Sequence, residues 1–368
     1  VGSSTATSSG TGVIVASETS SSTSTYGDNV SHVTITGNTI RGSYVGVQIN
    51  GIANTIHNDG VTISNNIFED QYYYGLRVYY MDNILVDGNK ISGLKNTTNY
   101  GMYLYYNNYI DVTKNDITAM YGMYYYYNNV YAPTSVMSKV ENNIMNAERT
   151  GLYAYGSRNY GAYHNTAYSY GTSSYYAGYF GGNQADSVDV RNNIFAAEGT
   201  NYAIYLSTFQ NVKTIDYNLY YTTGTNLANN GGAISNLAAL IASDTTNNQN
   251  SVEGDPAFIS STNLRTIVGV LQNDAGDNSV GVLTDFDGVS RPISGSTVVD
   301  MGAFEYDPLT SDLEIVSAEL MRGECLNTSD TIVVKVKNVI GGTLNMSTTP
   351  VVAEWSVTGP INSNGTLT

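Results

Sequence analysis

Tyrosine is the residue type that offers the clearest binding chemistry in this sequence. The chain contains 33 Tyr against 7 Phe and 1 Trp, and most of these tyrosines lie between residues 72 and 221. The segments GLRVYY (75–80), GMYLYY (101–106) and GMYYYY (122–127) repeat one pattern, in which a glycine precedes alternating apolar and large residues. A tyrosine ring can stack on a sugar, and its hydroxyl can donate and accept hydrogen bonds. The tyrosines therefore indicate a surface that contacts a glycan or a protein.

The alternation predicts which of these side chains face outward. Successive side chains of a strand point to opposite faces, so the second and fourth positions of each segment face one side and the third and fifth face the other. The predicted inward pairs are Val47/Ile49, Leu76/Val78, Met102/Leu104, Met123/Tyr125, Leu152/Ala154 and Ile204/Leu206. The third position is predicted to form an outward column of Gln48, Arg77, Tyr103, Tyr124, Tyr153, Tyr179 and Tyr205. The fifth position is predicted to form a second column of Asn50, Tyr79, Tyr105, Tyr126, Tyr155, Gly181 and Ser207. The nine tyrosines of these two columns are the predicted binding residues.

Catalytic residues are not evident on this predicted face, which carries one arginine but no carboxylate, lysine or histidine. Glycoside hydrolysis needs two carboxylates that flank the scissile bond, and lyase chemistry needs a base beside the substrate. We therefore predict no catalytic residue. A polysaccharide lyase or glycoside hydrolase is the alternative, and its acid and base would be drawn from loop residues such as Glu69, Asp70, Lys95 or Arg149.

No cofactor is predicted, and a Ca²⁺ site is the one alternative. The stretch Asp285-x-Asp287-Gly288 has part of a calcium-loop pattern but lacks the third acidic ligand and the distal Glu, so we predict a turn. Other carboxylates in the same region could add ligands, namely Asp255, Asp277, Asp300 and Glu305. The three histidines share no spacing and are predicted to be surface residues: His32, His57 and His164.

A second recurring phrase positions the tyrosine segments. It reads apolar-x-apolar-x-x-Asn-x-apolar, and its asparagines are Asn38, Asn66, Asn89, Asn115, Asn143, Asn165, Asn193 and Asn218. Successive asparagines are 28, 23, 26, 28, 22, 28 and 25 residues apart. A period in the twenties with strand-like alternation indicates a solenoid, in which eight stacked coils make a rod on the order of 40 Å long. We expect each Asn to adopt left-handed φ at a sharp turn and its amide to hydrogen-bond to the next Asn in the stack.

An Asn turn followed by a Gly-led strand resembles the right-handed parallel β-helix repeat family over about residues 13–225. The resemblance implies an all-β fold. In carbohydrate-active members of that family, the outer face of the Gly-led strand and its flanking loops form the sugar-binding groove, which here would be the tyrosine columns. The catalytic Gly-His-Gly and Asp-Asp signatures of the family do not occur in this chain. The resemblance therefore implies the fold and a binding face without implying catalysis.

The repeat ends near residue 225. GDPAF (254–258) and DMGAFEY (300–306) resemble the C-terminal closing segment of secreted bacterial β-helix proteins, and residues 234–241 favour a short helix packed on that segment. From Pro308 the sequence alternates like strands of an Ig-like β-sandwich and resembles the modules of large surface proteins of Bacteroidota. The expected parts are an irregular segment or first coil at 1–30, β-helix coils at 31–225, the closing segment at 226–308, and a partial Ig-like β-sandwich at 309–368.

Charge and composition limit the partners. Only 12% of residues are charged and the formal net charge is −16, which disfavours nucleic acid and acidic membranes. The single cysteine, Cys325, excludes an intrachain disulfide, and no run of 18 apolar residues predicts membrane insertion. Since the chain begins at Val1 without a signal sequence, we expect a processed piece of a longer exported protein at the cell surface.

These observations favour a non-catalytic extracellular structural or adhesive protein, part of a larger cell-surface or filament-forming chain. It would contact a glycan, a polysaccharide or another surface protein through the tyrosine columns, with many weak contacts summed along the rod. Two alternatives stay open. One is the β-helix lyase or hydrolase described above, and the other is a filament subunit that self-associates laterally through its tyrosine face.

Overall fold

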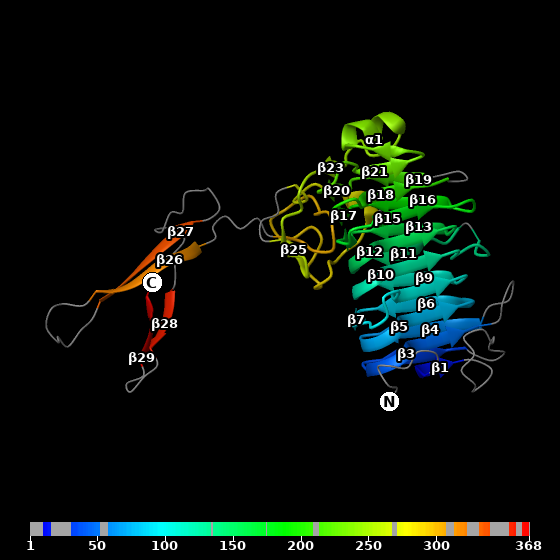
Figure 1. The fold of residues 1–368 in the computed structure, drawn as a ribbon, viewed down its shortest axis with the longest axis horizontal. Helices are drawn as coiled ribbons and strands as arrows, with labels where there is room; N and C mark the ends of the chain where they lie inside the picture. Colours follow the sequence, from blue (N-terminus) through cyan, green and yellow to red (C-terminus); the bar gives the residue numbers. More distant parts are fainter. Residues whose placement is uncertain are drawn as a thin grey trace. The chain divides into compact units, whose positions relative to one another are not determined.

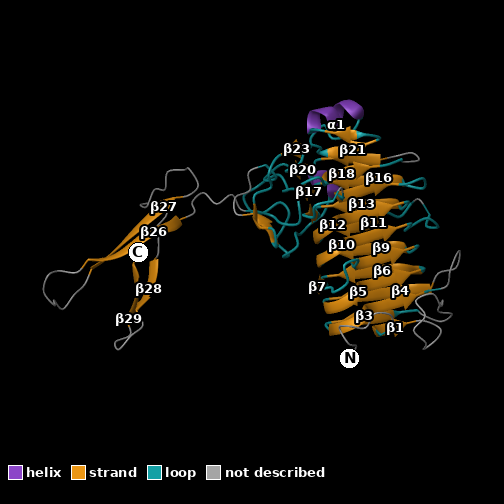
Figure 2. Cartoon of the chain, viewed as in Figure 1, coloured by secondary structure: helices purple, strands orange, loops and turns teal. Residues whose placement is uncertain are grey.

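The structure is a computed structural model whose rod comprises stacked β-strands (Figure 1). It describes residues 10–15, 31–51, 58–133, 135–173, 175–208, 213–266, 271–306, 313–321, 331–338, 353–357 and 363–367. The chain divides into two compact units, Val1–Tyr306 and Asp307–Thr368. The first unit is a parallel β-solenoid, as predicted (Figure 2).

Two large sheets form the walls of the solenoid. The strands that carry the Asn phrase make an eight-stranded sheet. These are β2 (Val33–Thr36), β4 (Asn58–Ser64), β6 (Met81–Asp87), β9 (Asn108–Thr113), β11 (Ser138–Glu141), β13 (Arg158–Tyr163), β16 (Asp186–Arg191) and β19 (Lys213–Asp216). Each strand pairs in parallel with the equivalent strand of the neighbouring coil.

The remaining strands of the rod make a 15-stranded sheet that contains the tyrosine segments. Its long strands are β3 (Thr39–Asn50), β5 (Ile67–Tyr79), β10 (Asp116–Tyr126) and β12 (Ile144–Tyr155). Its short strands are β1 (Thr11–Val15), β7 (Lys90–Ser92), β8 (Tyr100–Tyr105), β14 (Thr166–Ser169), β15 (Tyr176–Gly181), β17 (Ile194–Ala197), β18 (Tyr202–Leu206), β20 (Leu219–Thr222), β21 (Ala228–Asn230), β22 (Ala233–Ile234) and β23 (Val252–Glu253). A long strand spans two faces of the coil, because β12 pairs with β14 over its first half and with β15 over its second.

The core is built from the predicted inward residues. All six predicted pairs are buried and belong to one continuous hydrophobic cluster. Burial of this kind contributes about 1.5–3 kcal/mol for each large apolar side chain, and each coil supplies part of the cover for its neighbours.

The asparagine stack is confirmed, with one correction to its backbone. Asn115 shows the pattern, since its Nδ2 donates to the Asn143 Oδ1 at 2.9 Å and to the Val86 carbonyl at 2.9 Å, while its backbone N–H donates to the same Asn143 Oδ1 at 3.0 Å. The prediction that the stacked Asn itself adopts left-handed φ is wrong. The preceding residue does so, for example Lys114 at φ 52° and Asn142 at φ 54°. The Asn side chain satisfies buried backbone groups that this turn would otherwise leave unpaired.

A shorter polar stack at the next corner was not predicted. Asn107 and Asn128 repeat the same geometry, with the Asn107 Nδ2 donating to the Asn128 Oδ1 at 3.1 Å and to the Val78 carbonyl at 3.0 Å. Ser157 extends the stack, because its hydroxyl accepts from the Asn128 backbone N–H at 2.9 Å. This corner directly follows the tyrosine strands and fixes where they end.

The glycine that opens each tyrosine segment lies where the chain turns between two faces. At Gly122 a β-carbon would lie 2.5 Å from the Gly151 carbonyl oxygen and 3.2 Å from the Met145 β-carbon. From Gly75 to Gly151 a β-carbon at this corner would clash with the neighbouring coil, so glycine stacks on glycine there. Ala177 and Ala203 take the same place in later coils.

The C-terminal end of the rod is covered by α1 (Leu237–Ser243), the helix that the sequence predicts (Figure 1). Its Leu240 is fully buried and belongs to the main core cluster, together with Leu227 and Ile234. The helix contacts β21 and β22, which belong to the expected closing segment and lie at the end of the rod.

Residues 254–266 and 271–306 lie along the side of the rod, against β12, β14, β17 and β20. They include β24 (Phe258–Ser260), β25 (Asn263–Thr266) and the short 3₁₀ helix Asn278–Val280. Phe304 and Met301 belong to two small clusters with apolar residues of those four strands.

The described residues of the second unit form two antiparallel strand pairs. β26 (Leu313–Met321) pairs with β27 (Thr331–Asn338), and β28 (Ala353–Val357) pairs with β29 (Ser363–Leu367). An Ig-like sandwich stays a prediction for this unit. Cys325 lies outside the described residues, as does most of the segment 1–30.

Candidate binding surface

The two predicted tyrosine columns are present and in register. The residues at the third position of the Gly-led segments stack from coil to coil, and we call them the central column. Its tyrosines are Tyr103, Tyr124, Tyr153, Tyr179 and Tyr205. The second column, at the fifth position, comprises Tyr79, Tyr105, Tyr126 and Tyr155. The structure thus brings all nine predicted residues together on one side of the rod, while their binding role stays a prediction.

The columns are shorter and less exposed than the sequence suggests. Gln48 and Asn50 were predicted to face outward, but both are buried and hydrogen-bond to one another. Tyr179 is only 8% exposed, whereas the other eight predicted tyrosines are half-buried.

Two further tyrosine columns flank the predicted ones. The glycine-side column stands one residue before the corner glycine or alanine and comprises Tyr74, Tyr100, Tyr121, Tyr176 and Tyr202. The corner column follows the fifth position and comprises Tyr80, Tyr106 and Tyr127. Edge-to-face contacts join neighbouring columns, as between Tyr100 and Tyr124 at 4.9 Å and between Tyr105 and Tyr106 at 4.5 Å. We call the four columns together the tyrosine face.

The corner column has an unusual backbone. Tyr80, Tyr106 and Tyr127 have φ values of 54°, 51° and 52°, in the left-handed region that large side chains rarely occupy. Strict alternation along a strand does not account for this column, because the chain is already turning there. The sequence signal was the sixth letter of each segment, which is Tyr in all three repeats.

Rings within a column stack on each other. In the central column Tyr124 and Tyr153 lie 4.5 Å apart with 19° between ring planes, and Tyr153 and Tyr179 lie 4.5 Å apart at 27°. In the corner column Tyr106 and Tyr127 lie 5.2 Å apart at 13°. Parallel rings at such distances cover each other's faces. The inner rings therefore offer edges and hydroxyls to a ligand, and the expectation that their faces stack on sugars does not fit this geometry.

Two arginines lie over the tyrosine face. Arg77, in register with the central column, has its guanidinium carbon 4.3 Å from the Tyr79 ring centroid and 5.0 Å from that of Tyr74. Arg149 enters where β12 carries an extra residue relative to β10, and its Nη1 donates to the Tyr121 hydroxyl at 2.8 Å. Both cations are held against rings, an arrangement that stabilises stacked arginine.

Burial keeps several phenols of the tyrosine face protonated at neutral pH. Burial raises the pKa of Tyr100 to about 12, and burial likewise raises the pKa of Tyr127 to about 12. Burial also raises the pKa values of Tyr103, Tyr124 and Tyr153. A neutral phenol both donates and accepts a hydrogen bond, so the face is an uncharged array of hydroxyls rather than a set of bases.

The loop residues named for acid–base chemistry are engaged in ion pairs or ring contacts. Glu69 pairs with Arg41, and Lys95 pairs with Asp70 at 2.5 Å. Arg149 contacts Tyr121 as described above. These contacts give each charged group a structural partner.

Several of the carboxylates considered for Ca²⁺ are held by arginines or by backbone N–H groups. Asp287 forms a two-pronged ion pair with Arg265, and Asp277 pairs with Arg191 at 2.6 Å. The turn predicted at Asp285–Gly288 is confirmed, since the Gly288 N–H donates to the Asp285 carbonyl at 3.2 Å. Within the described part of the chain, no three His, Cys, Asp or Glu residues are grouped to hold a metal ion.

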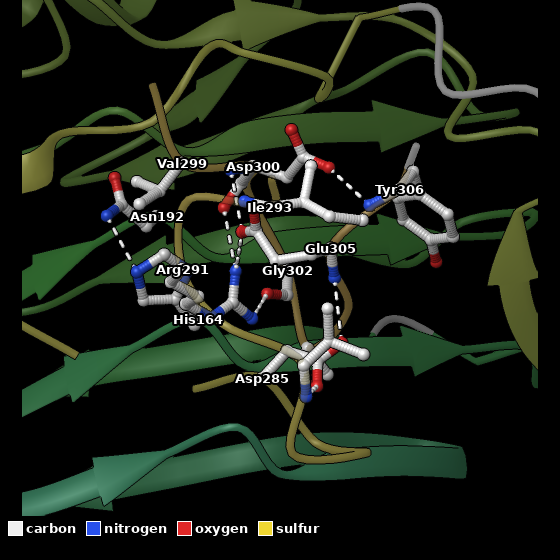
Figure 3. Close-up of polar contacts among 12 residues, drawn as sticks. His164, Asn192, Asp285, Arg291, Ile293, Val299, Asp300, Gly302, Glu305 and Tyr306 are labelled. Atoms are coloured by element: carbon white, nitrogen blue, oxygen red, sulfur yellow. Dashed lines mark hydrogen bonds and ion pairs between the residues drawn. The ribbon is translucent and has the colours of Figure 1, made fainter. Parts of the chain in front are cut away.

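A buried polar cluster joins the C-terminal segment to the rod (Figure 3). Arg291 pairs with Glu305, and both side chains are fully buried. The Arg291 Nη2 also donates to the Asn142 Oδ1 at 3.0 Å and to the Gly302 carbonyl at 2.8 Å. Burial raises the pKa of Glu305, and the Arg291 guanidinium opposes that rise. These contacts hold residues 291–305 against the coil that contains Asn142.

His164 belongs to the same cluster, and the prediction that it is a surface residue is wrong. It is 1% exposed, and its Nε2 lies 3.0 Å from the Asn192 Nδ2. Burial lowers its pKa well below the usual value, so the imidazole is neutral. His32 is exposed beside Asp59, and His57 lies outside the described residues. Sequence spacing could not identify His164 as buried, because its partners come from residues far away in the chain.

The comparisons with known proteins agree with the fold. A family model described as the right handed beta helix region matches residues 24–135. No curated protein matches the chain. The described residues contain no helix that is long and apolar enough to cross a membrane. The matched segment covers the first coils, including the tyrosine segments at 75–80, 101–106 and 122–127, so the tyrosine face is built on a chain similar to right-handed β-helix proteins.

Proposed function

We propose that this chain is a non-catalytic, rod-shaped adhesive module of a larger extracellular or cell-surface protein, and that its tyrosine face binds a polysaccharide. The observation that carries the proposal is the set of four adjacent tyrosine columns, held in register by the parallel strands. An extended chain of sugars laid across successive coils would meet equivalent hydroxyls at each coil.

Chemical complementarity supports a glycan over a protein partner. Ring stacking within each column leaves hydroxyls and ring edges for the ligand, and protonated phenols match the hydroxyls of a sugar as both donors and acceptors. Because the stacked rings cover each other's faces, the array offers less flat apolar surface than the centre of a protein interface usually has. The formal charge of −16 disfavours a polyanionic glycan, so a neutral one fits best.

The test removes hydroxyls while keeping the rings. The variant Tyr105→Phe/Tyr126→Phe/Tyr155→Phe should fold normally, because phenylalanine preserves the stack. Each neutral hydrogen bond contributes about 0.5–1.5 kcal/mol, so we expect about 100-fold weaker binding to the polysaccharide that a glycan array identifies. A matched control is Tyr109→Phe/Tyr170→Phe/Tyr217→Phe, which removes three hydroxyls elsewhere and should bind like the wild type.

The array experiment also distinguishes the alternatives. Equal binding by both triple variants would overturn the proposal. Capture of a protein partner or a second copy of the chain, lost only in the first variant, would favour adhesion to protein or lateral self-association instead. Reducing ends or unsaturated products released from a polysaccharide panel would favour the lyase or hydrolase alternative.

A further inference from the structure

The central column places phenol rings of successive coils in van der Waals contact. From Tyr103 to Tyr205 the consecutive ring centroids are 5.7, 4.5, 4.5 and 5.1 Å apart, with interplanar angles of 21°, 19°, 27° and 13°. Partners in this column are 21 to 29 residues apart in the sequence, because each ring belongs to a different coil. A covalent bond between two neighbours would therefore join two coils.

We propose that the central column is a site of oxidative tyrosine coupling, in which dityrosine bonds link successive coils of one rod. Each of two neighbouring phenols loses one electron and one proton to give a tyrosyl radical. The two radicals form one carbon–carbon bond between ring carbons ortho to the hydroxyls, and the two hydrogens on those carbons move to restore both phenols. The net change is loss of two electrons and two protons, which a peroxidase transfers to hydrogen peroxide to form two water molecules.

The fold favours coupling within one chain over coupling between chains. In the folded rod the parallel strands hold the rings close together, so the reaction partner is present at a high effective concentration. Two copies of the chain, each with a formal net charge of −16, also repel one another.

Because the columns contact one another, oxidation of a tyrosine in a neighbouring column can also lead to coupling in the central column. A radical formed on an exposed ring can pass to the central column through edge-to-face contacts, such as Tyr176 with Tyr205 at 4.8 Å and Tyr121 with Tyr124 at 5.4 Å. The core pair Tyr125 and Tyr160, 5.2 Å apart, differs because both rings are fully buried and packed on all sides. We therefore expect coupling in the surface columns and not in the core.

The experiment treats the full chain with a haem peroxidase and hydrogen peroxide at low protein concentration. We expect dityrosine fluorescence, a product that stays monomeric on a denaturing gel, and cross-linked peptides that pair Tyr124 with Tyr153 or Tyr153 with Tyr179. The linked rod should also melt several degrees higher, because each bond closes a loop in the unfolded chain.

The most specific variant replaces every second tyrosine of the central column by phenylalanine. In Tyr103→Phe/Tyr153→Phe/Tyr205→Phe no two tyrosines of the central column remain adjacent, although the ring stack is kept. Central-column cross-links should disappear, whereas Tyr109→Phe/Tyr170→Phe/Tyr217→Phe should keep them. The proposal is overturned if the products are cross-linked only between chains, if they map only to exposed tyrosines such as Tyr131, or if no dityrosine forms in the folded wild type.

Discussion

Replacing Arg291 by alanine should lower the free energy of unfolding by about 3–5 kcal/mol, the cost of leaving a buried charge without its partner. Glu305 would lose its ion pair in a site where both side chains are fully buried. The Asn142 Oδ1 and the Gly302 carbonyl would lose a donor as well. Because these contacts bridge the rod and residues 291–305, the C-terminal segment should detach first. Urea denaturation and limited proteolysis of residues 254–306 measure the two effects.

The matched control is Arg41→Ala, which breaks an ion pair whose arginine side chain is 69% exposed. A surface pair of this kind contributes about 1 kcal/mol or less. If Arg291→Ala and Arg41→Ala are equally stable and equally resistant to protease, the buried cluster does not hold the segment in place.

Raising the pH above about 10 should unfold the rod in a steep transition. Tyr125, Tyr160 and Tyr220 are fully buried, and burial raises the pKa of each phenol above its value in the unfolded chain. Between the unfolded and folded pKa values the unfolded chain binds fewer protons than the native one, so stability falls as the pH rises. Above the unfolded pKa, each buried phenol lowers the free energy of unfolding by about 1.4 kcal/mol per pH unit. The three phenols together therefore lower it by about 4 kcal/mol at pH 11. This is a large fraction of the 5–15 kcal/mol that is typical of folded proteins.

Circular dichroism and tyrosinate absorbance, followed together against pH, measure this transition. We expect the ionisation of most tyrosines to coincide with loss of β structure. The variant Tyr160→Phe should shift the midpoint to higher pH, because it removes one of the buried phenols. Gradual ionisation beginning near pH 10 with the strand signal intact would contradict the burial described above.

Local repetition explains why the rod could be predicted from the sequence. The Asn phrase and the inward pairs such as Leu76/Val78 follow from strand alternation and a period in the twenties, and both are confirmed. The register of the central column follows from the same repeat, because parallel strands stack equivalent residues. The left-handed residue before each Asn was missed, since two adjacent turn positions look alike in sequence when Asn142 precedes Asn143.

Features that depend on distant contacts or on the bend of the chain could not be predicted. His164 is buried only because residues 271–306 fold back on the rod, and its own sequence neighbourhood contains no sign of that packing. The glycine-side and corner columns lie where the strand turns, so a rule of strict alternation assigns Tyr100 and Tyr106 no outward place. The orientation of the rings could not be predicted either, because the sequence does not show whether stacked tyrosines present their faces or their edges to a ligand.

The dependence of affinity on ligand length tests the central claim most directly. The tyrosine face repeats along successive coils, so it should bind a polysaccharide as a series of equivalent contacts. Isothermal titration with a size-graded series of the bound glycan should show the dissociation constant falling with each added sugar until the chain spans the columns, and then becoming constant. The triple variant Tyr105→Phe/Tyr126→Phe/Tyr155→Phe should flatten this dependence. A monosaccharide that binds as tightly as the longest chain would show a single local site and would contradict the account.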